Sequence, residues 1–520
     1  MVFINRAPII EVGPDSLYSR IRVSILKDHT AVDGFAEEHL RIGQAVLRIV
    51  AEYASSIGET PVSSPATVSE LKAMFDEPLP VVGVARSEVL KQFKLDILPN
   101  SMQIPSPNYF GLFNPTPLPI AVWADVLASA INQNGAVWRN SSAANVIQAR
   151  VIKWLCTLLG YSEGAFGTLT SGGSEANLVA LKCARDNLRD SIRDNGLRSA
   201  DREIVFYASD QCHYSFVKSV DILGLGRNSL RKIPTDEKFH IRLDLLNEQI
   251  ELDKKSGLTV AGIIGACGAT STGIVDPLDD LADIAKDQAC WFHVDAAYGG
   301  ALAYSRKHQW KIKGIERADS ITLDPHKWMF VPFSCGAVLV RDGGLVLRNS
   351  FDITPEYLSE DRGGDDVEFD FFRYGQLGTV RFNALKLWMA LKTLGVNGYE
   401  QIIDRQIALT EYLASRLDEL NDFYRTGQVE TAVCCFRFVP DSAKNSSGQM
   451  QDSLQQALQQ RIEKSGKAWC ATTVLNGRRA IRININSFLT ERVHVDNLIK
   501  LLTDESQFLL PRGNDYEKQL

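Results

Sequence analysis

The sequence predicts an α/β protein built on a mainly parallel sheet. Short segments that are apolar throughout recur at residues 204–208, 260–266, 291–294, 320–323 and 336–340. Helical patterns separate them, for example at residues 243–254 and 278–287. Apolar strands that alternate with helices are typical of a parallel sheet buried on both faces. Ligands of such sheets bind at the carboxyl ends of the strands.

The length of 520 residues and the changes in pattern predict three regions. Residues 1–117 are expected to form a mostly helical N-terminal segment that ends in a proline-punctuated loop. Residues 118–390 hold the sheet, and residues 391–520 are expected to form a smaller α/β domain. Outside the large domain, helices are expected at 35–53, from Thr67, at 399–420 and at 453–464, and strands at 433–439 and 479–485.

Composition excludes several classes of protein. Hydrophobic residues make up 45%, charged residues 23%, and the net charge is -7, so we expect a globular chain with no nucleic-acid partner. No apolar run approaches the about 18 residues of a membrane span, and the N-terminus lacks the pattern of a secretory signal. The nine cysteines are scattered without a C-x-x-C pair, which argues against a metal site or a disulfide framework and favours the cytoplasm.

Lys327 lies in the most informative stretch, Ser-Ile-Thr-Leu-Asp-Pro-His-Lys-Trp-Met-Phe at 320–330. The amine is set between an apolar strand and three large apolar side chains. Partial desolvation favours the neutral form of an amine, which is a nucleophile for aldehydes. The alternative is that Lys327 is an ordinary solvated lysine.

Two further stretches suggest what Lys327 could bind. Residues 170–181, Thr-Ser-Gly-Gly-Ser-Glu-Ala-Asn-Leu-Val-Ala-Leu, place glycines before a helix, where free N–H groups bind phosphate; a plain tight turn is the alternative. Asp295 ends an apolar strand and needs a cationic partner, unless neighbouring amides satisfy it. His213 follows the strand at 204–208, where it is catalytic or structural.

Together these stretches resemble the group II decarboxylases that use pyridoxal phosphate, over about residues 105–502. The resemblance rests on Thr-Ser-Gly-Gly-Ser-Glu-Ala-Asn from Thr170, on His213, on His-Val-Asp-Ala-Ala-Tyr from His293, and on Pro-His-Lys-Trp from Pro325. It implies the fold of aspartate aminotransferase, known as fold type I, and pyridoxal 5'-phosphate as cofactor. It also implies an amino acid as substrate and a homodimer with shared active sites.

The resemblance also implies roles for single residues. Lys327 would hold the cofactor covalently, Asp295 would keep its pyridine nitrogen protonated, and His213 would stack on the ring opposite Ala297. Tyr357 would protonate the substrate carbon after carbon dioxide leaves. The remaining cofactor contacts are expected from Gly172, Gly173, Ser174, Thr270, Asp324 and His326, and the substrate contacts from Phe113, Asn114, His326 and Arg381.

Several positions depart from the family pattern and leave the substrate open. They are Ala269, Asp324, Leu112, Asn114, Pro115, Asn134 and Ala136. An aromatic L-amino acid is the preferred substrate. The alternatives are an acidic or diamino acid (glutamate, aspartate, cysteine sulfinate or 2,4-diaminobutyrate), or a catalytically silent relative that keeps the fold.

Overall fold

The computed structural model describes residues 30–64, 66–353 and 370–510. Contacts divide the chain into two units, Met1–Thr60 with Ser64–Ser101, and Pro61–Ser63 with Met102–Leu520. The three-region division drawn from the sequence stays a prediction. No helix within these described ranges is long and apolar enough to cross a membrane.

The first unit consists of helices. They are α2 (Thr30–Ser56), α3 (Val68–Met74), α4 (Arg86–Gln92) and the π-helix η1 (Phe93–Ile97). The two helices predicted here are present. Helix α3 begins as expected at Thr67, whose side chain accepts a hydrogen bond from the Glu70 backbone while Glu70 caps Thr67 in return.

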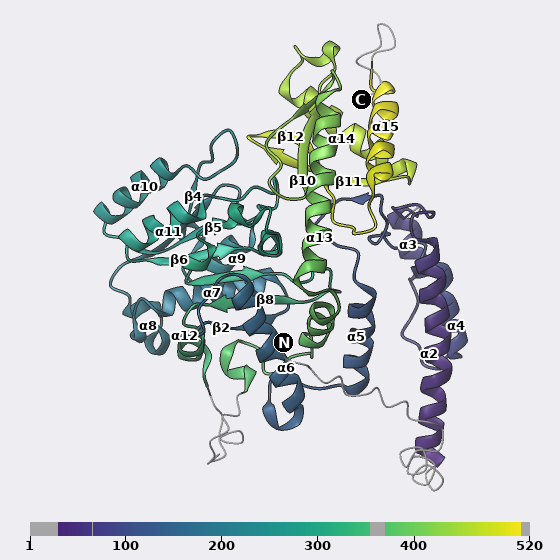
Figure 1. Ribbon diagram of the computed structural model, residues 1–520, viewed down its shortest axis with the longest axis horizontal. Helices are drawn as coiled ribbons and strands as arrows, with labels where there is room; N and C mark the ends of the chain where they lie inside the picture. The colour runs from purple at the N-terminus through teal and green to yellow at the C-terminus, as the bar shows by residue number, and fades with distance from the viewer. Residues whose placement is uncertain (1–29, 65, 354–369, 511–520) are drawn as a thin grey trace, which may run out of the picture. The chain divides into compact units, whose positions relative to one another are not determined.

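The second unit is organised around a seven-stranded sheet (Figure 1). Its order is β2-β8-β7-β6-β5-β3-β4, and only β8 runs antiparallel to its neighbours. The predicted, mainly parallel sheet is therefore confirmed. The strands are β2 (Phe166–Thr170), β3 (Ile204–Ser209), β4 (Leu230–Ile233), β5 (Thr259–Ala266), β6 (Trp291–Asp295), β7 (Ser320–Leu323) and β8 (Gly336–Val340).

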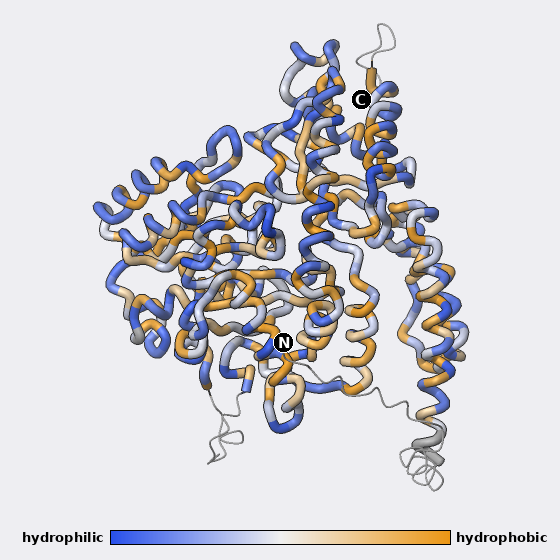
Figure 2. The backbone as a smooth tube through the Cα atoms, viewed as in Figure 1, coloured by the Kyte–Doolittle hydropathy of each residue, from blue (hydrophilic) through white to orange (hydrophobic). Residues whose placement is uncertain are grey.

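Both faces of this sheet are buried, as the apolar strands predicted. Along β3, Val205 and Tyr207 pack into one hydrophobic cluster, whereas Ile204 and Phe206 pack into another, because alternate side chains point to opposite faces. Figure 2 shows hydrophobic segments concentrated in the sheet and hydrophilic ones on outer helices such as α10. The helices that pack on the sheet are α6 (Trp138–Leu158), α7 (Gly173–Asp186), α9 (Ser215–Ile222), α10 (Leu243–Lys255), α11 (Leu278–Asp287) and α12 (Gly343–Phe351), whereas α5 (Pro119–Ile131) and α8 (Asp190–Asn195) pack mainly against other helices.

The C-terminal part forms a second sheet of order β1-β11-β12-β10-β9. Its first strand, β1 (Tyr109–Phe110), comes from the proline-punctuated loop expected at the end of the N-terminal segment and pairs with β11 in parallel. Helix α13 (Ala384–Asp418) runs from the large sheet to this smaller one (Figure 1). The other elements are β9 (Phe423–Arg425), β10 (Val433–Phe438), α14 (Gly448–Ser465), β11 (Trp469–Leu475), β12 (Arg478–Asn484) and α15 (Arg492–Gln507).

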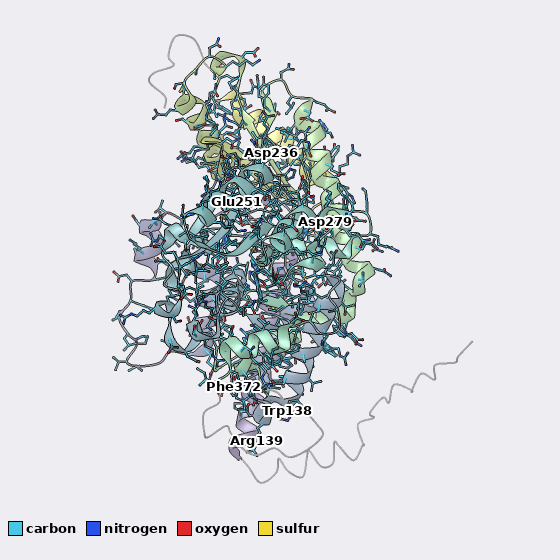
Figure 3. All side chains as sticks on the ribbon, turned by 90° about the vertical axis from the view of Figure 1, so that its left-hand side faces the viewer. Trp138, Arg139, Asp236, Glu251, Asp279 and Phe372 are labelled. Carbon is cyan, nitrogen blue, oxygen red and sulfur yellow. The ribbon has the colours of Figure 1, made fainter. Side chains whose placement is uncertain are left out.

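Short 3-10 helices connect several of these elements. They span Leu197–Ser199, Arg227–Ser229, Gly299–Tyr304, Gln309–Ile312, Ile315–Arg317, Phe371–Tyr374 and Asp441–Ala443. The Phe371–Tyr374 helix is tied to the start of α6. Phe372 N–H donates to the Ala136 carbonyl at 3.2 Å, and Trp138 N–H donates to Asp370 Oδ1 at 2.8 Å. Figure 3 shows Trp138 and Phe372 at the same end of the molecule.

Candidate active site

A cavity of about 380 Å³ lies at the carboxyl ends of the parallel strands. Its walls come from the start of α7 and from the loops that follow β3, β5, β6 and β7. The fold thus gathers one set of residues from segments that are far apart in the sequence. All ten residues expected to contact the cofactor line this cavity: Gly172, Gly173, Ser174, His213, Thr270, Asp295, Ala297, Asp324, His326 and Lys327.

The start of α7 forms a cradle of backbone N–H groups. The first N–H groups of a helix have no acceptor within the helix, and their partial positive charge favours an anion. Ser171 donates through N–H and Oγ to Glu175 Oε2, both at 2.7 Å, and this holds the turn in place. Gly173 is needed for close packing, because a Cβ there would lie 2.7 Å from Asp324 Oδ2.

Lys327 projects into the cavity from the turn after β7. Its neighbours Trp328, Met329 and Phe330 are buried, as the sequence predicted. Its Nζ lies 3.0 Å from Asp324 Oδ2, an ion pair that the sequence argument did not include. Asp324 Oδ1 is buried and has no hydrogen-bond partner among the described residues. The turn therefore keeps unused capacity to bind a polar group.

Asp295 ends β6 with its carboxylate at the cavity. Asp295 Oδ1 accepts a hydrogen bond from Ala297 N–H at 3.2 Å, and Oδ2 accepts one from Asn177 Nδ2 at 3.3 Å. In the described part of the chain, no lysine, arginine or histidine forms an ion pair with Asp295. A carboxylate held by amides alone can still bind a cationic group, such as a protonated ring nitrogen.

Two histidines face the cavity, and burial favours the neutral form of each. Burial lowers the pKa of His213, although the nearby Asp295 carboxylate opposes this effect. Burial also lowers the pKa of His326. His213 Nδ1 lies 2.8 Å from Ser215 Oγ and accepts from Ser215 N–H at 3.3 Å, so its proton is expected on Nε2.

An aromatic stack closes the side of the cavity next to Lys327. Phe113 stacks on Tyr298 with ring centroids 3.7 Å apart, and Tyr298 stacks on Trp328 at 4.6 Å. Lys327 Nζ lies 5.7 Å from the centre of the Phe113 ring. Behind Phe113, the guanidinium of Arg482 lies 4.6 Å from the same ring. The smaller sheet thus supports one wall of the cavity.

Three predicted site residues lie elsewhere or outside the described ranges. Asn114 and Arg381 are not among the residues that line the cavity. Arg381 donates to Ser129 Oγ at 3.0 Å and lies 3.5 Å from Asp125. Tyr357 belongs to residues 354–369, which lie outside the described residues. The roles given to these three residues stay predictions.

Several residues of the site were not predicted from the sequence. Asn177 lines the cavity, and its position four residues after Gly173, hence on the same helix face, was the available signal. Tyr298, the last residue of the motif that starts at His293, also lines it, and so does Phe333, for which the sequence has no comparable signal. Arg482 is 3% exposed, and its place behind Phe113 depends on pairing between distant strands.

The geometry fits pyridoxal phosphate. The cradle at Gly173 suits its phosphate, and Lys327 provides an amine for its aldehyde. Among the described residues Asp295 has no cationic partner, and the ring nitrogen would supply one. Ala297 and His213 both line the space between these groups. These features are the ones a phosphorylated aldehyde needs.

Comparisons with known proteins agree with this assignment. The pyridoxal-dependent decarboxylase conserved domain matches residues 69–439. The chain is 31% identical to the aromatic-L-amino-acid decarboxylase of Bacillus atrophaeus over 480 residues, which cover 92% of this chain and 98% of that protein. It is also 31% identical to the acidic amino acid decarboxylase GADL1 of Xenopus tropicalis over 376 residues, which cover 72% of this chain and 73% of that protein.

Solved structures show the same relationship. The crystal structure of mouse CSAD superposes with a TM-score of 0.86 at 27% identity and covers 92% of this chain and 99% of that chain. The crystal structure of Oryza sativa TDC with PLP and tryptamine superposes with a TM-score of 0.85 at 27% identity. It covers 91% of this chain and 99% of that chain. The fold is therefore fold type I, and the chain belongs to the family of pyridoxal-phosphate-dependent amino acid decarboxylases.

Proposed function

We propose that this chain decarboxylates an aromatic L-amino acid to the corresponding amine and carbon dioxide. The supporting observation is the Phe113 wall, 8% exposed, which offers a flat ring close to Lys327. Aromatic rings gain from stacking on such a wall. The described lining contains no arginine and no lysine besides Lys327, so an acidic side chain lacks a partner charge there.

The residues of the cavity would share the work as follows. Bound pyridoxal phosphate supplies an electron sink for the pair released when the carboxylate leaves. Gly173 and Ser174 would hold the phosphate through backbone and hydroxyl groups, and Lys327 would supply the amine that holds the cofactor. Asp295 would hold a proton at the ring nitrogen, while His213 would cover one face of the ring and Ala297 the other.

Proton delivery to the substrate carbon is assigned to Tyr357. The flanks of residues 354–369 are joined, because Arg373 donates to Asp352 at 2.8 Å and 2.6 Å. This ion pair joins described residues on either side of residues 354–369, and Tyr357 itself lies outside the described residues.

A screen of amino acids for carbon dioxide release tests the substrate. We expect kcat/KM for phenylalanine, tyrosine or tryptophan to exceed that for glutamate, aspartate, cysteine sulfinate and 2,4-diaminobutyrate by at least about 100-fold. Phe113→Leu should lower kcat/KM for the aromatic substrate. Leu112→Ala, at an exposed neighbouring position, should not. A higher kcat/KM for an acidic or diamino acid would refute the aromatic assignment.

A second candidate is an acidic substrate, and Arg482 favours it. This guanidinium is buried, its Nη1 donates to the Gly111 carbonyl at 2.7 Å, and its Nε and Nη2 have no partner among the described residues. Burial lowers the pKa of Arg482. If a substrate carboxylate reaches it past Phe113, Arg482→Met should abolish turnover of glutamate or cysteine sulfinate. An aromatic substrate should be affected much less.

We also infer a homodimer that shares its active sites. In the described part of the first unit, α3, α4 and η1 contain no buried residue, and large apolar side chains are exposed. Among them are Phe35 at 65%, Val81 at 97% and Val82 at 80%. An apolar surface of this kind is typical of a subunit interface. Sedimentation of the active enzyme as a monomer would contradict the inference.

The cytoplasm is the compartment that we infer. All nine cysteines are free, and seven of them are buried. Free thiols persist in a reducing compartment. Fractionation of cells that make the protein would test the location, and recovery of the enzyme outside the cytoplasm would count against it.

A further inference from the structure

A continuous chain of hydrogen bonds runs beneath the cavity, and one amide lies at its branch point. Asn177 is 1% exposed on α7. Its Nδ2 donates to Asp295 Oδ2 at 3.3 Å and to Ser215 Oγ at 3.0 Å. Its Oδ1 lies 3.2 Å from His293 Nε2. One hydrogen bond links this amide to Asp295, and two hydrogen bonds, through Ser215, link it to His213; both residues are proposed cofactor contacts.

The direction of each hydrogen bond follows from groups that can act in one way only. An amide NH2 group only donates, and the NH2 group of Asn177 faces Asp295 Oδ2. The oxygen of Asn177 then faces His293, whose Nε2 must carry the proton. At the other end, Trp291 Nε1–H only donates, to Ser320 Oγ at 2.8 Å. Ser320 can therefore donate its own proton to His293 Nδ1, also at 2.8 Å.

The second branch reaches His213. Ser215 Oγ accepts from Asn177, which leaves its proton free for His213 Nδ1 at 2.8 Å. The Ser215 N–H donates to the same nitrogen at 3.3 Å. Because His213 Nδ1 receives hydrogen bonds from Ser215, its ring proton must lie on Nε2. Burial lowers the pKa of His293 to about 4, so the neutral ring that this chain requires is also the stable one.

We propose that Asn177 is a positioning residue whose single amide fixes both the carboxylate of Asp295 and the ring of His213. It would act on the reaction only through these two neighbours. The inference rests on the roles proposed above for Asp295 and His213, but not on which amino acid is the substrate. It also explains why a polar amide lies in the buried interior of α7.

The test compares Asn177→Leu, which has a similar size and no amide, with a matched control. Asn145→Leu removes another fully buried amide, whose Nδ2 donates to the Ser141 carbonyl and hydroxyl in α6, away from this network. In the cofactor-free protein, labelled with ¹⁵N-histidine, His213→Gln assigns the ring signals of His213. We expect the Nδ1 signal of His213 to move in Asn177→Leu and to stay unchanged in Asn145→Leu.

The loaded enzyme gives a second measurement. The visible absorbance of the lysine-bound cofactor should change its pH dependence in Asn177→Leu, because Asp295 is no longer oriented. The affinity of Asn177→Leu for the cofactor should stay within a few-fold of that of the wild type. Its kcat should fall by about 10- to 100-fold, which is the effect expected from the loss of a hydrogen bond to a charged group. KM should change little.

Two results would overturn the proposal. The first is an unchanged His213 signal together with an unchanged pH dependence of the absorbance. The second is an equal change in Asn145→Leu, which would indicate a general loss of stability. If Asn177→Leu does not fold, Asn177→Ala removes the amide without a bulky replacement and is judged by the same criteria. A failed substrate screen would leave the histidine measurement valid, so the two proposals can be told apart.

Discussion

Acidification is expected to destabilise the protein through His293. The side chain is fully buried, and burial lowers its pKa from 6.5 to about 4. A histidine whose pKa is lower in the folded than in the unfolded protein stabilises the fold fully at pH values above the unfolded pKa. This stabilisation is lost as the pH falls from 6.5, the unfolded pKa, towards 4, the folded pKa. From these two pKa values, the loss is about 2 kcal/mol at pH 5 and close to zero at pH 7.5.

The measurement is the free energy of unfolding in urea at pH 7.5 and pH 5, with pyridoxal phosphate at a saturating concentration. His293→Gln should be less stable than wild type at pH 7.5, because it loses the contacts to Ser320 and Asn177. At pH 5 the difference in the free energy of unfolding between wild type and His293→Gln should be smaller by about 2 kcal/mol, because only the wild type has the imidazole of His293 to protonate.

Asp276 provides a control of opposite sign. Burial raises its pKa from 3.8 to about 6, so it contributes stability at low pH that is lost as the pH rises through 6. The gap between wild type and Asp276→Asn should therefore widen at pH 5, by about 1 kcal/mol. In the wild type, the change in the free energy of unfolding between the two pH values combines the contributions of His293 and Asp276, so each variant is compared with the wild type. A gap for His293→Gln that is the same at both pH values would refute the reasoning.

Four further predictions concern the cavity. Borohydride reduction and peptide mapping should label Lys327, and a label on any other lysine would remove it from its role. Asp295→Asn should retain some cofactor but lose about 10²- to 10³-fold in kcat, measured as carbon dioxide release; near-normal turnover would argue against a contact with the ring nitrogen. Gly173→Ala should weaken pyridoxal phosphate binding by about tenfold or more, because the new Cβ would lie 2.7 Å from Asp324 Oδ2. In the control Gly344→Ala the new Cβ has open space around it, so this variant should bind the cofactor as the wild type does. Tyr357→Phe should still release carbon dioxide while amine formation falls by about 10²- to 10⁴-fold, and an unchanged amine yield would reject the proton donor.

The strands recognised from the sequence are those whose signal is local. Segments such as 260–266 and 336–340 are apolar throughout, so their burial on two faces can be inferred without knowing their neighbours. Strands β1, β2, β4, β9 and β11 were not predicted, and four of them have five residues or fewer, too few to show a clear pattern. Phe166–Thr170 and Leu230–Ile233 become strands through pairing with β8 and β3. Tertiary context overrides weak propensity in such segments.

The sequence by itself determined which groups are proposed to hold the cofactor. Lys327 follows one predicted strand and Asp295 ends another, and in a parallel sheet the carboxyl ends of the strands meet at one edge. The start of α7 was predicted separately, from its glycines before a helix. Only the tertiary structure decided what surrounds these groups. The contact of Asn177 with Asp295 spans 118 residues, and the loop with Phe113 is held by strand pairing to β11. Contacts of this range depend on how distant elements pack, and no local pattern of residues records that packing.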